Sequence, residues 1–100
     1  MADCCLTLIC PPAIEEKLLD TLLATAGNEV FTSTPTFSHG TAPGRWSTTE
    51  QVMGRSRAVQ VQILLTATEL AQMLTRLRAD FAGAGLRYWV CPLSAEGEVA

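Results

Sequence analysis

The distribution of apolar and polar residues predicts three β-strands in the first two thirds of the chain. Residues 3–10, DCCLTLIC, form a short apolar run that ends at two prolines, and residues 29–37, EVFTSTPTF, are β-branched and aromatic. Pro35 lacks a backbone N–H, so the second strand is expected at a sheet edge or at a bulge. Residues 57–65, RAVQVQILL, predict the third strand. One face of its strict alternation consists of Val59, Val61, Ile63 and Leu65.

Two further segments have the spacing of amphipathic helices. The first follows the two prolines, which suit a first helical turn, and Gly27 with Asn28 supplies its stop. Its apolar positions are Ile14, Leu18, Leu19, Leu22, Leu23 and Ala26. The second helix begins at Thr66, which has capping-box spacing to Glu69. Its apolar positions are Leu70, Met73, Leu74, Leu77 and Phe81.

The last part of the chain completes a known order of elements. A glycine turn at Gly83 and Gly85 leads into a fourth strand from Leu86 to about Leu93, and residues 94–100 are expected to be a flexible tail. The order β-α-β-loop-β-α-β is typical of the ferredoxin-like βαββαβ fold. We therefore predict a single α+β domain over residues 1–100, with two helices on one face of a four-stranded antiparallel sheet.

The predicted strands carry apolar residues on both faces. In the first strand Leu8 and Ile9 point to opposite sides, and in the fourth Tyr88 and Trp89 do the same. Because the helices can cover only one side, another subunit is expected to cover the other. The sequence thus favours a homo-oligomer.

Composition limits the classes of function. The chain is 48% hydrophobic and 17% charged, with a net charge of −3, which argues against a nucleic-acid-binding protein. No apolar run is long enough to span a membrane, and the N-terminus lacks a secretory pattern, so we expect a cytoplasmic protein without membrane insertion. The four cysteines are then interpreted as reduced thiols. Adjacent Cys4 and Cys5 would point to opposite faces of a strand and not form a simple chelate.

The polar segment 38–57, SHGTAPGRWSTTEQVMGRSR, is unusually long for a connection in so small a domain. Its three arginines and one glutamate give it a charge of +2, which leaves −5 for the rest of the chain. Arginines beside glycines suit a small anionic ligand, because guanidinium groups and approachable backbone N–H groups both bind phosphate. The alternative is that the arginines keep the segment soluble or pair with acidic neighbours.

At this point the chain resembles the PII signalling superfamily, and most closely a small PII-like family of unassigned function that is commonly encoded beside heavy-metal efflux pumps. The resemblance rests on LTLICPPAIEEKLLDTLL, FTSTPTFSHG, EQVMGRSRAVQVQ and FAGAGLRYWVCPL, which span most of the chain. It implies a homotrimer that binds a ligand in clefts between subunits, at the base of a long T-loop corresponding to residues 38–57. That loop would report ligand binding to a protein partner, such as a membrane transporter.

The resemblance also suggests ligand-binding positions. The glycine pattern where the T-loop begins is similar to Ser38, His39 and Gly40, although only the second glycine is kept, and the phosphate-binding turn looks like Gly83 and Gly85. The usual lysine of that turn and the paired C-terminal arginines are absent. An anion such as an adenine nucleotide would have to use other arginines. The full set of predicted ligand-binding residues is His39, Gly40, Gly54, Arg55, Arg57, Gly83, Gly85 and Arg87.

Residues of the same regions are also candidates for two other roles. Within the 38–57 segment we expect Arg45, Trp46, Glu50 and Gln51 to contact the partner, because an exposed tryptophan is a common interface anchor; Trp46 packing on a neighbouring subunit is the alternative. His39 and Cys91, or Cys10 at lower weight, are candidate ligands for a transition-metal ion contributed by different subunits. Buried cysteines that act as small hydrophobic residues are the simpler interpretation.

The sequence therefore predicts a non-enzymatic, PII-like regulatory protein. No nucleophile-and-base spacing and no phosphate-loop motif support catalysis. Two alternatives stay open, a trimeric metal-binding protein of the copper-tolerance type and a structural adaptor without a ligand.

Overall fold

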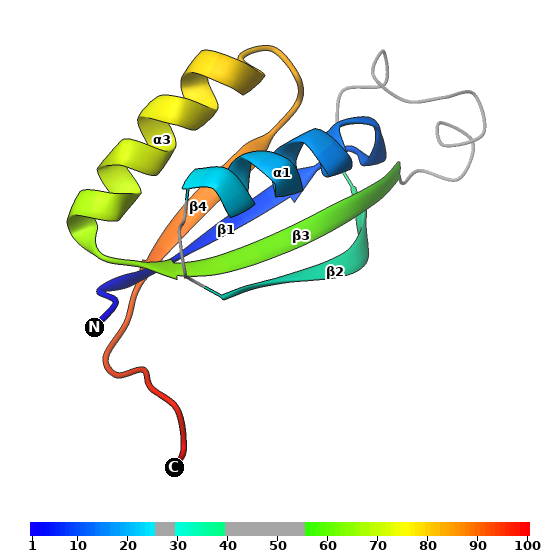
Figure 1. The fold of residues 1–100 in the computed structure, drawn as a ribbon. Helices are drawn as coiled ribbons and strands as arrows, with labels where there is room; N and C mark the ends of the chain where they lie inside the picture. The colour runs from blue at the N-terminus through cyan, green and yellow to red at the C-terminus, as the bar shows by residue number, and fades with distance from the viewer. Residues whose placement is uncertain (26–29, 40–55) are drawn as a thin grey trace.

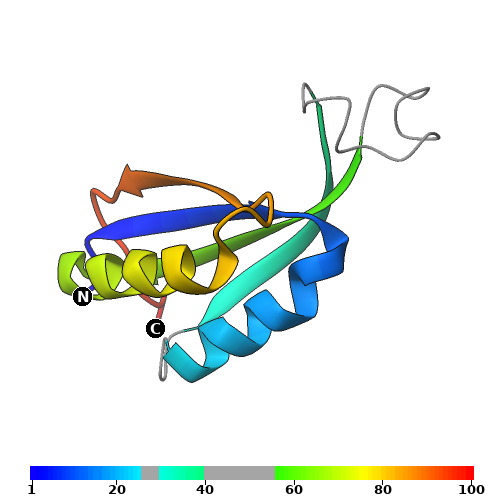
Figure 2. The same cartoon turned by 90° about the horizontal axis from the view of Figure 1, so that it is seen from above.

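The fold is a four-stranded antiparallel sheet with both helices on one face (Figures 1 and 2). A computed structural model describes residues 1–25, 30–39 and 56–100. None of the helices in this part of the chain is long and apolar enough to cross a membrane. The sheet order is β2-β3-β1-β4. The elements are β1 (Cys4–Cys10), the 3-10 helix η1 (Pro12–Ile14), α1 (Glu15–Thr25), β2 (Phe31–Ser38), β3 (Ser56–Leu65), α3 (Ala67–Phe81) and β4 (Arg87–Pro92).

The predicted fold class and element order are confirmed, with boundaries that shift by a few residues. The strands β2 and β3 include Ser38, Ser56 and Arg57, so the two ends of the predicted 38–57 loop belong to the sheet. Residues 94–100 form no helix or strand, and the Glu96 carboxylate accepts a hydrogen bond from the Ala2 N–H at 2.7 Å. The predicted helix stop at 27–28 lies outside the described residues.

The hydrophobic core lies between the sheet and the two helices. Alternate residues of the central strands, such as Leu6 in β1 and Ile63 in β3, are fully buried against Leu18 of α1 and Met73 of α3. Each such side chain contributes about 1.5–3 kcal/mol through its removal from water. The sequence alternation in β3 therefore identified its core face correctly.

The strand register also defines the opposite side of the sheet, which we call the open face because no described element covers it. Cys5 pairs with Leu64 and Cys91, Thr7 with Gln62 and Trp89, and Ile9 with Gln60 and Arg87. Toward the β2 edge the open face is polar, with threonines at alternate positions of β2. Toward β4 it has an apolar part, which consists of Ile9, Leu64, Cys5, Trp89 and Cys91, with Arg87 at the loop end of β4. Trp89 is 48% exposed there. The apolar part of the open face is the feature that predicted an oligomer.

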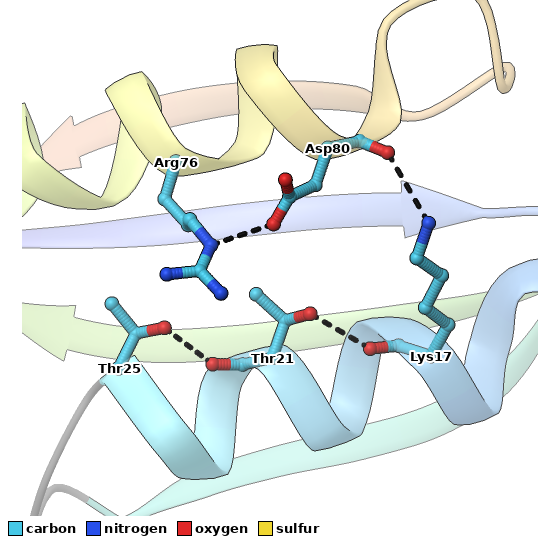
Figure 3. A network of polar contacts seen from close by, with 5 residues as sticks. All are labelled: Lys17, Thr21, Thr25, Arg76 and Asp80. Atoms are coloured by element: carbon cyan, nitrogen blue, oxygen red, sulfur yellow. Dashed lines mark hydrogen bonds and ion pairs between the residues drawn. The ribbon is translucent and has the colours of Figure 1, made fainter.

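Polar contacts fix both ends of α3. At its start, Thr66 and Glu69 form the predicted capping box, with hydrogen bonds of 3.2 and 2.8 Å. At its end, the Lys17 ammonium donates to the Asp80 carbonyl at 3.5 Å (Figure 3). The same ammonium lies 5.1 Å from the centre of the Phe81 ring. A cation at a helix C-terminus is favourable because the last carbonyl groups carry partial negative charge. The capping box is internal to α3, whereas the Lys17 contacts connect α1 to the end of α3.

Pro35 lies in β2, an edge strand, as its missing N–H requires. The other edge is β4, where Pro92 faces Cys4 across the register. A proline on an edge strand cannot donate a hydrogen bond to an added strand.

Cys10 ends β1 and is completely buried on the core side of the sheet. Burial raises the pKa of its thiol to about 11, with the nearby Glu15 carboxylate acting in the same direction. The folded protein therefore holds this proton at pH values where the unfolded chain, with a thiol pKa near 9.0, releases it.

We predict that the free energy of unfolding declines as the pH rises from 9 toward 11, by on the order of 2 kcal/mol from Cys10 alone. Urea titrations between pH 8 and pH 10.5 measure the effect as the difference between the wild type and Cys10→Ala. The variant is less stable throughout but should lose less stability with rising pH. Cys91→Ala, which removes an exposed thiol, is the matched control and should follow the wild type. Parallel curves for wild type and Cys10→Ala would show the inference to be wrong.

Candidate functional site

The end of the sheet where β2 stops and β3 begins, which we call the loop end, gathers several predicted site residues. Ser38 pairs with Ser56 at the tip of the β2–β3 hairpin, and Cys10 at the end of β1 pairs with Val59. The first residue of β4, Arg87, pairs with Ile9 at the same end. The turn between α3 and β4 therefore also lies there (Figure 1).

Glycine is required in that turn by its backbone conformation. Gly83 and Gly85 have φ angles of 77° and 84°, in the left-handed region that other residues avoid. The Ala84 N–H donates to the Phe81 carbonyl at 3.0 Å and so closes the end of α3. A Cβ atom on Gly85 would lie 3.3 Å from Cγ of Pro11. The turn therefore packs closely on the chain that leaves β1.

A pocket of about 190 Å³ lies between the last turns of α3, the glycine turn and β4. Its lining is mainly apolar, with Leu8, Leu77 and Phe81 among the lining residues. At its polar side, the Arg78 guanidinium donates a hydrogen bond to the Tyr88 hydroxyl at 3.1 Å. We call this cavity the α3–β4 pocket.

The charge of Arg78 gives this pocket its chemical character. On the same helix, Arg76 and Asp80 form an ion pair at 2.6 Å (Figure 3). Arg78 is not part of this ion pair. Arg78 is exposed and contacts a neutral phenol. A guanidinium beside an apolar cavity suits a ligand with an apolar body and an anionic group, because it binds phosphate and carboxylate in bidentate fashion.

A second, larger pocket of about 540 Å³ lies at the other edge of the sheet. It is formed between the first turn of the helical segment, including Pro12 and Glu15, and the β2–β3 hairpin, including Phe37 and Arg57. Phe37 and Arg57 face each other across the register on the helix side of the hairpin. We call this cavity the hairpin pocket.

The two pockets cannot form one site within a single chain. They belong to opposite edges, β4 and β2, which are separated by three strand spacings of about 4.8 Å, or roughly 14 Å in all. The α3–β4 pocket is also smaller than the roughly 300–1,000 Å³ typical of small-molecule sites. The α3–β4 pocket therefore has the size of a partial site, and both pockets lie at sheet edges that a neighbouring subunit can extend.

The structure separates the predicted ligand-binding residues into several places. Gly83 and Gly85 line the α3–β4 pocket, and Arg57 lines the hairpin pocket. Arg87 lies on the open face, on the other side of the sheet from both pockets. The remaining predicted ligand and partner residues, Gly40, Arg45, Trp46, Glu50, Gln51, Gly54 and Arg55, lie outside the described residues.

The candidate metal ligands do not meet in one chain. His39 follows β2 at the loop end and is exposed, whereas Cys91 lies near the end of β4, on the other edge and at the far end of the sheet. Cys10 is buried in the core. Within residues 1–25, 30–39 and 56–100, no group of three or more His, Cys, Asp or Glu side chains is placed to hold a metal ion.

Sequence reasoning missed the roles of Arg78 and Tyr88. A signal was present, because Arg78 follows Leu74 by four positions and precedes Phe81 by three, which places it on the flank of the apolar stripe of α3. The sequence pattern indicated Tyr88 only as an apolar strand residue. Its contact with Arg78 depends on the tightness of the glycine turn, which the sequence alone does not fix.

The glycine turn yields a matched pair of substitutions. We predict that Gly83→Ala destabilises the protein by about 1–2 kcal/mol, because alanine at positive φ is strained while the space around it is empty. Gly85→Ala should destabilise it more, since its Cβ would also press on the Pro11 ring. Urea denaturation of both variants measures the difference. Equal losses of stability would contradict the prediction, because they would mean that the Pro11 ring can move away from the added Cβ atom without an energetic cost.

Comparison with known proteins places the chain in a family. A family model described as a protein of unknown function, DUF3240, matches residues 1–100, and no curated protein matches. A DUF3240 family protein from Shewanella baltica has a similar structure, with a TM-score of 0.79, 20% identity and coverage of 100% of this chain and 99% of that one.

Two further solved structures have the same fold. A PII-like signalling protein from Thermus thermophilus has a TM-score of 0.67 and 15% identity over 93% of this chain and 88% of its own. The periplasmic divalent cation tolerance protein CutA from Archaeoglobus fulgidus has a TM-score of 0.69 and 11% identity over 98% and 89%. The predicted resemblance to PII-like proteins is thus confirmed at the level of the fold, and the chain belongs to the DUF3240 family.

Proposed function

We propose that this protein is a PII-like regulator that binds a small anionic ligand, with adenine nucleotides as the first candidates, in clefts between the subunits of a homotrimer. Segment 38–57 would then report ligand binding to a protein partner. The observation that carries this proposal is the pair of partial sites at the loop end, which lie on opposite edges of one sheet and each contain an arginine.

A cyclic oligomer brings such partial sites together. In a ring, one surface of each subunit meets a different surface of the next, so the β4 edge of one subunit can face the β2 edge of its neighbour. The α3–β4 pocket of one subunit would then be completed by the hairpin pocket of the other. This arrangement supplies two guanidinium groups, Arg78 and Arg57, to a single ligand.

The ligand class follows from the pocket chemistry. Leu8, Leu77 and Phe81 offer an apolar surface for a planar ring, and Arg78 lies next to the glycine turn where a phosphate group would be held. The sequence lacks the lysine that PII proteins have at this turn, and we propose that Arg78 takes over its charge. Because both linings combine apolar surface with one arginine, they suit recognition of a ligand rather than catalysis.

The apolar part of the open face supports the trimer. Trp89, Ile9 and Leu64 lie on the open face, which no described element covers. Packing of three such faces around a common axis would remove them from water. The trimer would thus use the open faces at its centre and the sheet edges at its clefts.

Transmission to the partner is proposed to pass through the β2–β3 hairpin. Phe37 and Arg57 line the hairpin pocket and belong to the two strands that lead into segment 38–57. A ligand that contacts them would favour one arrangement of the loop base over others. The family resemblance supports a heavy-metal efflux transporter as the partner. The sequence pattern, without a membrane span or a secretory N-terminus, supports the cytoplasm as the proposed compartment.

We predict that ATP raises the melting temperature of the wild type and that Arg78→Gln removes most of this shift. Saturation at a hundred times the dissociation constant contributes about 2.7 kcal/mol of stability. Loss of a charge-assisted hydrogen bond to phosphate weakens binding by roughly 1.5–3 kcal/mol, or about 10- to 150-fold. Thermal shift with ATP, ADP, AMP and bicarbonate, followed by calorimetry with the best ligand, measures both quantities.

Arg76→Gln is the matched control for this experiment. Arg76 lies two residues earlier on the same helix and pairs with Asp80 rather than lining the pocket, so its variant should bind ATP like the wild type. A shift with Zn(II), Cu(I) or Ag(I) but with no anion would favour the metal-binding alternative. No shift with any compound would leave a structural adaptor.

The trimer has its own test. Size-exclusion chromatography with light scattering should give three times the mass of the chain, and Trp89→Arg should shift the protein toward smaller species because it places a charge in the proposed interface. Gln72→Arg, at an exposed position of α3, is the control and should remain trimeric. A monomeric wild type would remove the inter-subunit cleft from the proposal.

A further inference from the structure

We propose that Cys5 and Cys91 form a two-coordinate thiolate site for a soft monovalent cation such as Cu(I) or Ag(I). The two residues face each other directly across the β1–β4 pair. They are the cysteines that the sheet directs to the open face, whereas Cys4 and Cys10 point into the core. Both thiols belong to one chain, so neither ligand of the ion comes from a neighbouring subunit or from the proposed nucleotide.

The hydrogen-bond pattern fixes the spacing of this pair. The Leu93 N–H donates to the Asp3 carbonyl at 3.0 Å, two residues along both strands from Cys91 and Cys5. Because hydrogen-bonded pairs recur at every second position of an antiparallel ladder, Cys5 and Cys91 are also such a pair. Pro92 lies between these two hydrogen-bonded pairs, opposite Cys4, at a position where the ladder with β1 needs no backbone N–H.

This spacing favours a bridging ion over a disulfide. In a hydrogen-bonded pair the Cα atoms are about 5.5 Å apart and the Cβ atoms are at the wide end of the roughly 4.5–5.5 Å range. A relaxed disulfide needs Cβ atoms about 3.5–4.5 Å apart. Two metal–thiolate bonds of about 2.3 Å place the sulfur atoms roughly 4.6 Å apart across an ion, which side chains at this separation can reach.

The surroundings select a soft ion. The Cys5 thiol lies 4.0 Å from the Thr7 hydroxyl, Leu64 flanks Cys5 on its other side, and Trp89 follows on the same face of β4. Asp3, the nearest carboxylate along β1, accepts a hydrogen bond from the Ala67 N–H at 3.0 Å. Thiolates without oxygen or imidazole partners favour Cu(I) over hard divalent ions.

The core cysteines do not compete for the ion. Cys4 is adjacent to Cys5 in sequence but buried, and its thiol donates to the Leu65 carbonyl at 3.3 Å. Cys10 is also buried on the core face. Because both core thiols point away from the open face, the facing pair Cys5 and Cys91 is the favoured site.

The test is a competition of the reduced full-length protein with a colorimetric Cu(I) chelator under anaerobic conditions. We expect one Cu(I) per chain. Cys5→Ser and Cys91→Ser should each weaken binding by about 100-fold, as expected when an intramolecular second ligand is lost. The double variant should lose less than the two single losses added as free energies, because each substitution already breaks the chelate. Cys4→Ala, at the adjacent core position, should retain the wild-type affinity.

A second readout separates the site from general thiol binding. In a Trp46→Phe background, Ag(I) should quench the fluorescence of Trp89, which lies two residues from Cys91 on the same face, and this quenching should vanish in Cys5→Ser. Circular dichroism verifies that each variant is folded. Additive losses in the single variants, an equal loss in Cys4→Ala, or rapid formation of a Cys5–Cys91 disulfide in air would each overturn the proposal.

Discussion

The placement of both helices on one face of the sheet is the constraint on which the rest of the structure depends. Strand residues alternate between two sides, so burial of one set by α1 and α3 leaves the other set without cover from the described chain. The covered set supplies the core, including Leu6 and Ile63. The uncovered set includes Trp89 and the facing thiols of Cys5 and Cys91. Core, proposed interface and proposed ion site therefore follow from one geometric rule applied to adjacent residues.

The width of the sheet separates the two pockets from each other. Because β2 and β4 are edges, the features at the loop end are spread over the full width of the sheet. The α3–β4 pocket lies beside the last turns of α3, and burial of Leu77 and Phe81 in the core fixes that end of the helix. Rigid elements thus position each partial site, while their combination requires a neighbour. This is a physical reason for a ligand-dependent protein of this fold to be an oligomer.

Sequence reasoning succeeded where a local pattern decides the structure. The alternation of Val59 to Leu65 found the core strand, the Thr66–Glu69 spacing found the helix start, and Pro35 found an edge strand. Both glycines of the α3–β4 turn were identified because their conformation excludes other residues. Contacts between elements that are distant in the sequence could not be predicted in this way. The Arg78–Tyr88 hydrogen bond and the Cys5–Cys91 pair depend on the register of β4 against β1, which no short stretch of sequence encodes.

The shared use of β1 and β4 connects the two proposed sites physically. Leu8 and Tyr88 pair in the same ladder as Cys5 and Cys91, three residues away, but point into the α3–β4 pocket on the opposite face. An ion bridging the two thiols would hold the register and twist of this strand pair, and therefore also the wall of the pocket. A ligand in the pocket would act on the same pair from the other side. If either ligand changes the preferred geometry of the ladder, thermodynamic linkage requires that each alters the affinity for the other by the same factor.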